Sequence, residues 1–254
     1  MHNIKLTLAY DGTDFSGWQI QPGRLTIQGA LVEVLRKLTQ EPLTVHGAGR
    51  TDAGVHALGQ VAHFKTHSEL TPAEFQRACN ALLPPAIRVV AALEVGPNFH
   101  ARWQALAKTY RYRLYRGRIV PPFIWKYVLH YPYPLNVAAM QQAAPLFVGT
   151  HDFASFAAST GSEEGDLERS SVREIYRAEI IEPLGGEEMH FEFRGKSFLR
   201  FMVRKMAGTL LDVGRGKLAP EDIPRLFELC DRSKSGPTVP PQGLCMVTVE
   251  YPEP

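Results

Sequence analysis

Along this chain of 254 residues, the spacing of apolar residues switches repeatedly between the period of a strand and that of a helix. Helices are expected over residues 27–38, 71–83, 136–147, 199–210 and 220–230. Strands are expected over residues 5–10, 43–45, 61–64, 87–95, 109–115, 172–181, 188–194 and 245–251. Because strands cluster with helices without alternating strictly with them, the pattern predicts an α+β chain with a largely antiparallel sheet flanked by helices.

Local signals at the ends of two helices support these assignments. Thr26 is placed to cap the helix that begins at residue 27. Thr71 and Glu74 have the spacing of a capping box, with Pro72 at the first helical position. The sequence therefore predicts where both helices begin as well as that they form.

Composition places the chain among ordinary globular proteins. Hydrophobic residues make up 44% and charged residues 21%, and the length allows two lobes, which we expect at residues 1–104 and 105–254. No apolar run reaches the roughly 18 residues of a membrane span, and the first residues lack the pattern of a secretory signal. Cys79, Cys230 and Cys245 are few and far apart, which predicts neither a disulfide framework nor a zinc site and favours a cytoplasmic location.

The formal net charge of +2 conceals an uneven distribution of acids. No Asp or Glu occurs in the 57 residues between Glu94 and Asp152, where the average of 26 in 254 would place about six. A second acid-free stretch lies between Glu192 and Asp212. Such segregation indicates a surface that binds a polyanion, although solvated strand faces paired with acids from elsewhere would give the same pattern. The bases expected to contact RNA are Arg102, Arg111, Arg113, Arg116, Arg194, Lys196 and Arg200.

Periodicity also predicts where some of these bases point. On the strand over 109–115, alternation places Arg111 and Arg113 on one face and two tyrosines on the other. On the helix expected from residue 199, Arg200 and Arg204 are four residues apart and should share a face.

The densest local signal is the segment from Gly47 to Ala57, where three glycines fall within eight residues. Glycines at this density imply tight turns or a close approach of the backbone to something else. Arg50 and Asp52 can converge on one point, although a surface turn with a local ion pair fits the spacing equally well. A dinucleotide-binding loop is disfavoured, because Asp52 stands where the last glycine belongs and no helix follows. No metal is expected, since four nearby histidines match no familiar ligand spacing: His46, His56, His63 and His67.

A series of motifs in matching order, spread over essentially the whole chain, resembles the pseudouridine synthases of the TruA type. The segment from Gly49 to Phe64 is similar to the signature of that family. The other matching segments are Tyr10-Asp11-Gly12, Gly17-Trp18-Gln19, Asn80 to Pro84, Phe99 to Arg102, Lys108 to Tyr112, Ser197 to Arg204, and Gly243-Leu244. Two departures are visible: Phe201 stands where a polar residue is frequent, and the loop over 159–170 is unusually acidic.

The resemblance implies the pseudouridine synthase fold and an isomerase that modifies tRNA in the anticodon stem-loop, at positions thirty-eight, thirty-nine and/or forty. It further implies a homodimer and no cofactor. Asp52 would be the catalytic carboxylate, Tyr110 would contact the target uracil, and Arg204 would pair with Asp52 and hold it ionised and oriented. Arg50 would occupy the space left by the extruded base, and Leu244 would help to wall the pocket.

The chemistry of the reaction agrees with these implied roles. Pseudouridine formation breaks the bond from C1′ to N1, rotates the uracil and joins C1′ to C5, so no atoms are gained or lost and no cofactor is required. A carboxylate such as Asp52 can add to uracil C6 or to C1′, or act as a base at C2′, and the sequence leaves these routes open. A stacked uridine is out of reach and must be flipped, at a cost of a few kcal/mol.

Two functions of other classes stay open at this level. A non-catalytic RNA-binding protein or RNA chaperone would bind RNA without forming product, and the joint presence of Asp52, Tyr110 and Arg204 argues against it. An Asp-dependent glycosidase or nucleosidase would require a second carboxylate, and no acidic partner accompanies the glycine-rich loop.

Overall fold

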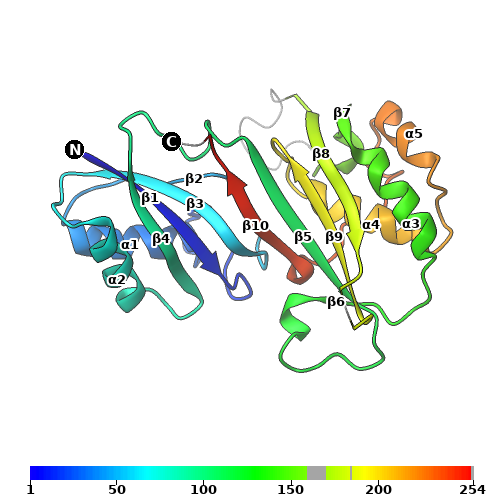
Figure 1. Cartoon of the computed structure of the whole chain (residues 1–254), viewed down its shortest axis with the longest axis horizontal. Coiled ribbons are helices and arrows are strands. Elements are labelled where there is room, and N and C mark those ends of the chain that lie inside the picture. Colours follow the sequence, from blue (N-terminus) through cyan, green and yellow to red (C-terminus); the bar gives the residue numbers. More distant parts are fainter. Residues whose placement is uncertain (159–169, 184, 253–254) are drawn as a thin grey trace. The chain divides into compact units, whose positions relative to one another are not determined.

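The computed structural model describes residues 1–158, 170–183 and 185–252, and the chain forms two compact units (Figure 1). The first unit comprises Met1–Leu106 and Cys245–Pro254, and the second comprises Ala107–Leu244. The two lobes expected at residues 1–104 and 105–254 stay a prediction. The units differ from these lobes because the end of the chain belongs to the first unit. Within the described ranges, no helix combines the length and the apolar content that crossing a bilayer requires.

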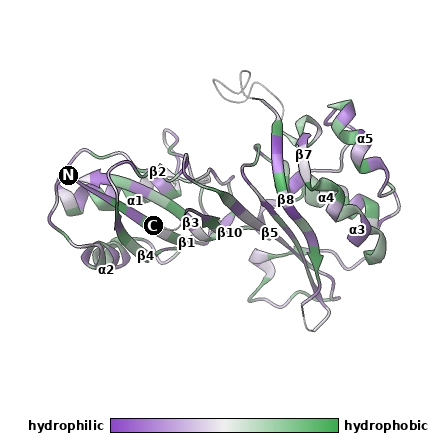
Figure 2. Cartoon of the chain, turned by 45° about the horizontal axis from the view of Figure 1, so that its top comes forward, coloured by the Kyte–Doolittle hydropathy of each residue, from purple (hydrophilic) through white to green (hydrophobic). Residues whose placement is uncertain are grey.

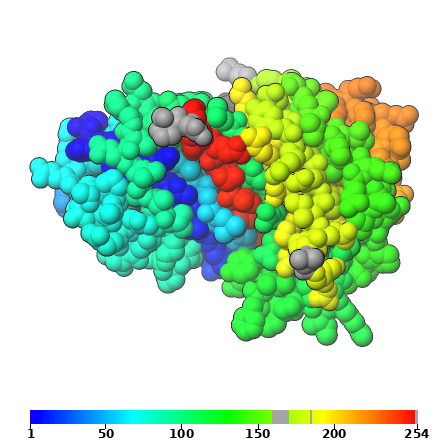
Figure 3. All heavy atoms as spheres, in the orientation of Figure 1, coloured from blue at the N-terminus to red at the C-terminus, as the bar shows by residue number. Residues whose placement is uncertain are grey.

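The first unit is built on a sheet with the strand order β4-β1-β3-β10. Strand β1 (His2–Tyr10) is antiparallel to both β3 (His56–Thr66) and β4 (Ile87–Val95). Strand β10 (Leu244–Glu250) runs parallel to β3 and lies beside it in Figures 1 and 3, where β10 is red and β3 is cyan. The short strand β2 (His46–Gly47) pairs with the middle of β3.

Two helices, α1 (Ile27–Thr39) and α2 (Pro72–Leu82), complete the first unit (Figure 1). Phe75 of α2 is fully buried and meets Phe64 of β3 edge to face, with ring centroids 5.3 Å apart. Burial of such side chains is the main favourable contribution to folding, and it fixes α2 against the sheet.

The second unit contains an antiparallel sheet in the order β5-β9-β8-β7. These strands are β5 (Ala107–Tyr115), β9 (Glu188–Gly195), β8 (Val172–Ile181) and β7 (Gly149–Asp152), and β6 (Leu129–His130) runs parallel to β5. The helices are α3 (Val137–Ala143), α4 (Met202–Gly214) and α5 (Asp222–Leu229), along which hydrophobic and hydrophilic residues are mixed in Figure 2. Single 3-10 turns occur at Trp125–Tyr127, Ala144–Phe147, Ala154–Phe156 and Pro241–Gly243.

The second unit has a core of its own, centred on phenylalanine. The rings of Phe147, Phe153, Phe156 and Phe227 contact one another, and Phe193 of β9 meets Phe147 with ring centroids 6.3 Å apart. The α+β class with a largely antiparallel arrangement and flanking helices, as predicted from the sequence, is therefore confirmed.

Both predicted helix starts are confirmed at atomic detail. The Thr26 side chain accepts a hydrogen bond from the backbone N–H of Gly29. Thr71 accepts from the N–H of Glu74, and the Glu74 carboxylate accepts from the N–H of Thr71, which is the reciprocal pair of a capping box.

The strand predicted at Leu43–Val45 is wrong, because this segment is irregular and β2 begins only at His46. The Gln28 side chain donates to the carbonyl oxygen of Val45 at 2.8 Å, so a helix side chain takes the place of a strand partner. On the other side of the glycine-rich loop, β3 begins at His56, five residues earlier than predicted.

Two predicted helices differ from the structure. Residues 136–147 form α3, capped by Asn136, followed by a 3-10 turn, because Pro145 has no N–H to continue the helix. The helix predicted from Leu199 starts at Met202, after Phe201 adopts a left-handed backbone with φ of 65°. Of the acidic loop expected over 159–170, residues 159–169 lie outside the described residues.

Candidate active site

The glycine-rich segment forms the connection between β2 and β3 in the first unit, and Asp52 lies in its middle. The first residues of this loop are tied to β3 by two hydrogen bonds. The N–H of Ala48 donates to the carbonyl of Val61 at 2.7 Å, and the Gln60 side chain donates to the carbonyl of Gly49 at 2.8 Å. The loop therefore projects from a rigid strand, which is what a precisely positioned catalytic group requires.

Thr51 anchors the loop to the segment that follows β1. The N–H of Trp18 donates to the Thr51 carbonyl at 3.0 Å, and the Thr51 hydroxyl lies 2.8 Å from the hydroxyl of Tyr10. Burial raises the pKa of Tyr10, so this phenol keeps its proton at every physiological pH. Thr51 is buried, whereas its neighbours Arg50 and Asp52 are exposed and half-buried, respectively.

Two glycines allow this close packing. A Cβ on Gly12 would lie 2.0 Å from the carbonyl oxygen of Val55, and a Cβ on Gly17 would lie 2.6 Å from that of Thr51. Gly17 also has φ of 88°, a backbone conformation that other residues rarely adopt. Only glycine lets the turn after β1 touch the backbone of the loop that carries Asp52.

His56, the first residue of β3, closes the other end of the loop. Its Nδ1 accepts a hydrogen bond from the N–H of Gly12 at 3.1 Å and lies 3.2 Å from the carboxylate of Asp11. The Tyr10-Asp11-Gly12 turn and the glycine-rich loop are thus one hydrogen-bonded structure. The described residues contain no group of three or more His, Cys, Asp or Glu side chains arranged to hold a metal ion.

The remaining residues expected around the substrate lie in the second unit. Tyr110 and Tyr112 are buried on β5, as alternation predicts. Tyr110 packs edge to face on Phe198, with ring centroids 5.0 Å apart, whereas the Tyr112 hydroxyl donates to the carbonyl of Pro240. Leu244 is buried and is the first residue of β10.

Arg204 lies in the first turns of α4, where its Nε donates to the carbonyl of Val239 at 2.8 Å. The prediction that Arg200 and Arg204 share a helix face is wrong, because Arg200 precedes the helix. The left-handed Phe201 nevertheless brings them together, since both guanidinium carbons lie 4.9 Å from the centroid of its ring. Attraction of both cations to the same aromatic ring partly offsets their repulsion.

Three of the bases expected to contact RNA form ion pairs within the second unit. Arg111 and Arg113 point away from the buried face of β5, as predicted. Arg111 is 2.9 Å from Glu192, and Arg113 is 2.9 Å from Glu188. Arg116 is 2.7 Å from Glu182. These pairs show where the side chains lie, and the RNA contacts stay predictions.

The other expected RNA contacts have different surroundings. Arg102 lies over the ring of Trp103 at 5.0 Å in the first unit, and Arg194 lies over the ring of Tyr176 at 5.2 Å in the second. Lys196 is exposed.

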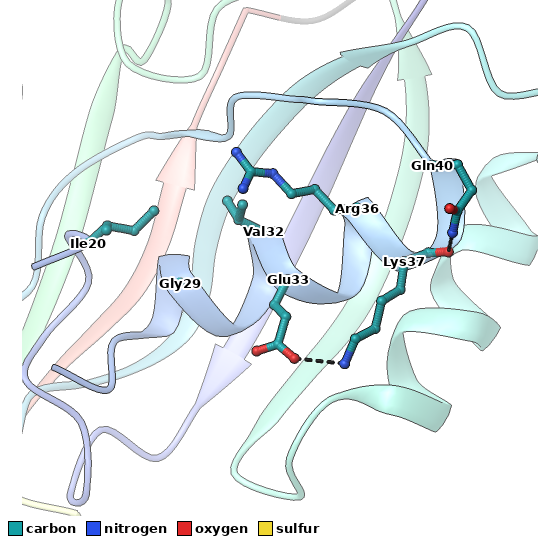
Figure 4. Close-up of a pocket in the computed structure, with 7 residues that line it drawn as sticks. All are labelled: Ile20, Gly29, Val32, Glu33, Arg36, Lys37 and Gln40. Atoms are coloured by element: carbon teal, nitrogen blue, oxygen red, sulfur yellow. Dashed lines mark hydrogen bonds and ion pairs between the residues drawn. The ribbon is translucent and has the colours of Figure 1, made fainter. Parts of the chain in front are cut away.

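A shallow hollow on helix α1 is unrelated to these residues (Figure 4). Glu33 and Lys37 form an ion pair of 2.7 Å one turn apart at its edge, and the Gln40 amide donates to the carbonyl of Lys37. These are solvent-exposed contacts that support the helix, and they do not indicate a binding site. The residues that line the hollow are Ile20, Gly29, Val32, Glu33, Arg36, Lys37 and Gln40.

Comparison with known proteins decides the class to which this arrangement belongs. A family model described as tRNA pseudouridine synthase matches residues 7–104 and 143–252. The chain belongs to the tRNA pseudouridine synthase family. This membership makes it an enzyme of the isomerase class, and it confirms the resemblance recognised in the sequence motifs.

Relatives in this family match over their full length. The tRNA pseudouridine synthase A of Solibacter usitatus is 46% identical over 252 residues, which cover 99% of this chain and 100% of the relative. Desulfotalea psychrophila tRNA pseudouridine synthase A 1 is 45% identical over 253 residues, which cover 99% and 100%. The tRNA pseudouridine synthase A of Exiguobacterium sibiricum is 46% identical over 253 residues, which cover 100% and 98%.

In this tRNA pseudouridine synthase, sequence reasoning missed the residues that hold the loop in place. Tyr10, Gln60 and Gly17 had no assigned role, although all three stand in the motifs that resemble the family. Tyr10 contacts Thr51 across 41 residues of sequence and Gln60 contacts Gly49 across 11, whereas Gly17 has a left-handed backbone, and none of these features leaves a periodic signal.

Proposed function

We propose that the chain converts uridine to pseudouridine at positions thirty-eight, thirty-nine and/or forty in the anticodon stem-loop of tRNA, with the carboxylate of Asp52 taking part in the chemistry. The observation that carries the proposal is the half-buried position of Asp52 on a loop fixed from both sides. Thr51 on one side of Asp52 is held by Trp18 and Tyr10, and the carbonyl of Asp52 itself accepts from the N–H of Val55 at 3.1 Å.

The proposed reaction needs no external reactant. The bond from C1′ to N1 breaks, the uracil turns, and a bond from C1′ to C5 forms, while C5 loses its proton to solvent and N1 gains one. The base must leave the stack before a carboxylate can reach it, so base flipping is part of the proposal. Asp52 could attack C6 or C1′ or remove a proton at C2′, and each route uses the same side chain.

The roles of four further residues rest on the family resemblance. In this proposal, Tyr110 contacts the uracil and Arg204 orients the carboxylate. Leu244 forms a wall of the pocket, and Arg50 occupies the vacated space in the RNA stem. A homodimer, a cytoplasmic location and activity without a cofactor belong to the same proposal.

The test replaces Asp52 with Asn, which removes the carboxylate and keeps the shape. Tritium release from tRNA labelled at uridine C5 should fall to background, while affinity for tRNA stays within about tenfold, because binding comes from many phosphate contacts. Asp14→Asn is the matched control, since Asp14 is an exposed acid with the same change of charge. Turnover at the wild-type rate in Asp52→Asn would end the assignment.

The choice of position needs a separate measurement. Three tRNA substrates, each with uridine at only one of the three positions, should be tested with the wild-type enzyme. Product in at least one of them, and none in a tRNA that lacks all three uridines, is expected. Product formed only elsewhere in the tRNA would refute the anticodon stem-loop assignment and leave the role of Asp52 intact.

A further inference from the structure

The first unit holds a row of aromatic rings at the start of the loop that carries Asp52. The ring of His46, on β2, lies 5.1 Å from that of His63 on β3 and 5.1 Å from that of His100. Trp103 extends the row, with its ring centroid 5.4 Å from His100. His46 directly precedes the glycine-rich segment, so the row leads from Trp103 to the beginning of the loop.

Backbone hydrogen bonds fix these rings in place. Nδ1 of His63 accepts from the N–H of Ala101 at 3.2 Å, and Nδ1 of His100 accepts from the N–H groups of Arg102 and Trp103 at 3.1 and 3.3 Å. A ring nitrogen that accepts carries no proton, so both imidazoles are neutral in this arrangement. Burial lowers the pKa of His63 to about 4 and also lowers the pKa of His100, with the neighbouring histidines acting in the same direction. At neutral pH His63 and His100 are therefore uncharged, and their rings are held in place beside Trp103.

Trp103 at the outer end of the row is 72% exposed, although it is the largest apolar side chain type. The guanidinium of Arg102 lies 5.0 Å from the centroid of its indole ring and is itself exposed. Leaving an indole in water forgoes the free energy of burying it, and the backbone that carries this indole is fixed by the hydrogen bond from the backbone N–H of Trp103 to Nδ1 of His100. An exposed aromatic ring beside a guanidinium is the combination that proteins use to hold single-stranded nucleic acid, with the base on the ring and the phosphate on the cation.

We propose that Trp103 is a stacking site for one unpaired nucleobase of the RNA substrate and that Arg102 binds the adjacent phosphate. The proposal rests on the proposed function in that it takes RNA as the substrate. Geometry supports RNA over a protein partner, because an exposed indole with a guanidinium beside it matches a flat base and its adjacent phosphate. The bases of a hairpin loop are unpaired and can lie flat on the indole.

The test compares two substitutions at Trp103 with one at a second exposed tryptophan. Trp103→Ala should weaken binding of an anticodon stem-loop RNA roughly 5- to 150-fold, the range found when a stacking aromatic is removed. Trp103→Phe keeps an aromatic ring and should bind within about threefold of wild type. Trp125→Ala is the matched control, because Trp125 is 58% exposed and also has a cation, Lys126, near its ring. Equal thermal melting points would show that the exposed substitutions leave the fold intact.

Fluorescence gives an independent readout. The chain has three tryptophans, of which Trp18 is only 2% exposed, so Trp103 is the one exposed indole in a Trp125→Phe variant. Titration of this variant with the RNA should quench its emission as the base stacks. Unquenched emission, wild-type affinity of Trp103→Ala, or equal losses in Trp103→Ala and Trp125→Ala would each overturn the stacking site.

The two proposals fail separately. Wild-type protein that forms pseudouridine in the same RNA, together with an unaffected Trp103→Ala, would refute the stacking site and keep the proposed function. Loss of binding in Trp103→Ala, together with no product from the wild type, would refute the proposed function and keep the stacking site.

Discussion

Replacing Gly17 with Ala should disable the enzyme through the backbone of the loop that carries Asp52. Gly17 is buried, and the Cβ of an alanine would lie 2.6 Å from the carbonyl oxygen of Thr51 and 3.1 Å from the carbonyl carbon of Asp52. The atoms in the way belong to the backbone and cannot rotate aside. The substitution must therefore move the loop, the turn after β1, or both.

The size of the effect follows from the geometry. An ordinary contact of a Cβ begins at 3.4 Å, so the gap of 2.6 Å must widen by about 0.8 Å. A displacement of about 1 Å at a catalytic group can lower turnover about 100-fold, and we expect a loss of 10- to 100-fold. The φ of 88° adds a strain of about 1–2 kcal/mol, which lowers the free energy of unfolding.

Gly23→Ala separates the strain from the displacement. Gly23 has φ of 68°, and a Cβ there would meet nothing within 4 Å. It should therefore cost about 1–2 kcal/mol of stability and leave turnover unchanged. The assay is single-turnover tritium release at saturating enzyme, with urea midpoints measured for both variants. If folded Gly17→Ala turned over as fast as Gly23→Ala, the inference that Gly17 positions the loop that carries Asp52 for turnover would be refuted.

Four further predictions concern charge, pH and cofactors. Arg200→Ala should flatten the salt dependence of RNA affinity by about 0.7 to 0.9 in log–log slope, the effect of one phosphate contact, and an unchanged slope would remove that contact. Arg113→Ala should lower the urea midpoint of unfolding, because Glu188 loses its half-buried partner. The slope of RNA affinity against salt in the same variant tests the RNA contact predicted for Arg113. The pKa of His63 is about 4 in the folded chain and near 6.5 in the unfolded chain, so protonation of His63 opposes folding. The contribution of neutral His63 to the free energy of unfolding should be fully present above pH 6.5 and fall by up to about 3 kcal/mol as the pH drops to 4. His63→Gln should reduce that loss in urea titrations, and an identical pH profile would contradict it. Turnover on pre-folded tRNA should survive dialysis against EDTA, and activity restored only by a specific cofactor would refute this expectation.

The parts of the fold that could be predicted are those determined by neighbouring residues. The Thr71 capping box and the alternation along β5 require only local chemistry, and the structure reproduces them. The strand predicted at Leu43–Val45 does not form, because the side chain of Gln28, which is 17 residues away in sequence, donates a hydrogen bond to the Val45 carbonyl. The start of α4 was missed because Phe201 adopts a left-handed backbone, which no propensity predicts for a phenylalanine.

The candidate site shows the same division. The cluster of glycines around Asp52 could be recognised in the sequence because close backbone packing requires glycine, and the motifs indicated the family. The partner of that packing could not be predicted, since Gly12 and Gly17 approach the loop only after β1 and β3 have paired. Trp103 was equally hidden, because a sequence does not reveal that an indole stays exposed.

Residues in a stretch of sequence without acids can still have acidic neighbours in the folded chain. This bears on how strongly each of the expected RNA contacts attracts RNA. Antiparallel pairing of β5 with β9 places Glu192 opposite Arg111, and Glu188 reaches Arg113, so acids from a distant segment line this strand. An arginine–glutamate pair is neutral as a unit, and RNA would have to share the guanidinium with the carboxylate. Electrostatic attraction to RNA should therefore be weaker at Arg111, Arg113 and Arg116 than their place in an acid-free stretch of sequence suggests, because each shares its charge with a glutamate.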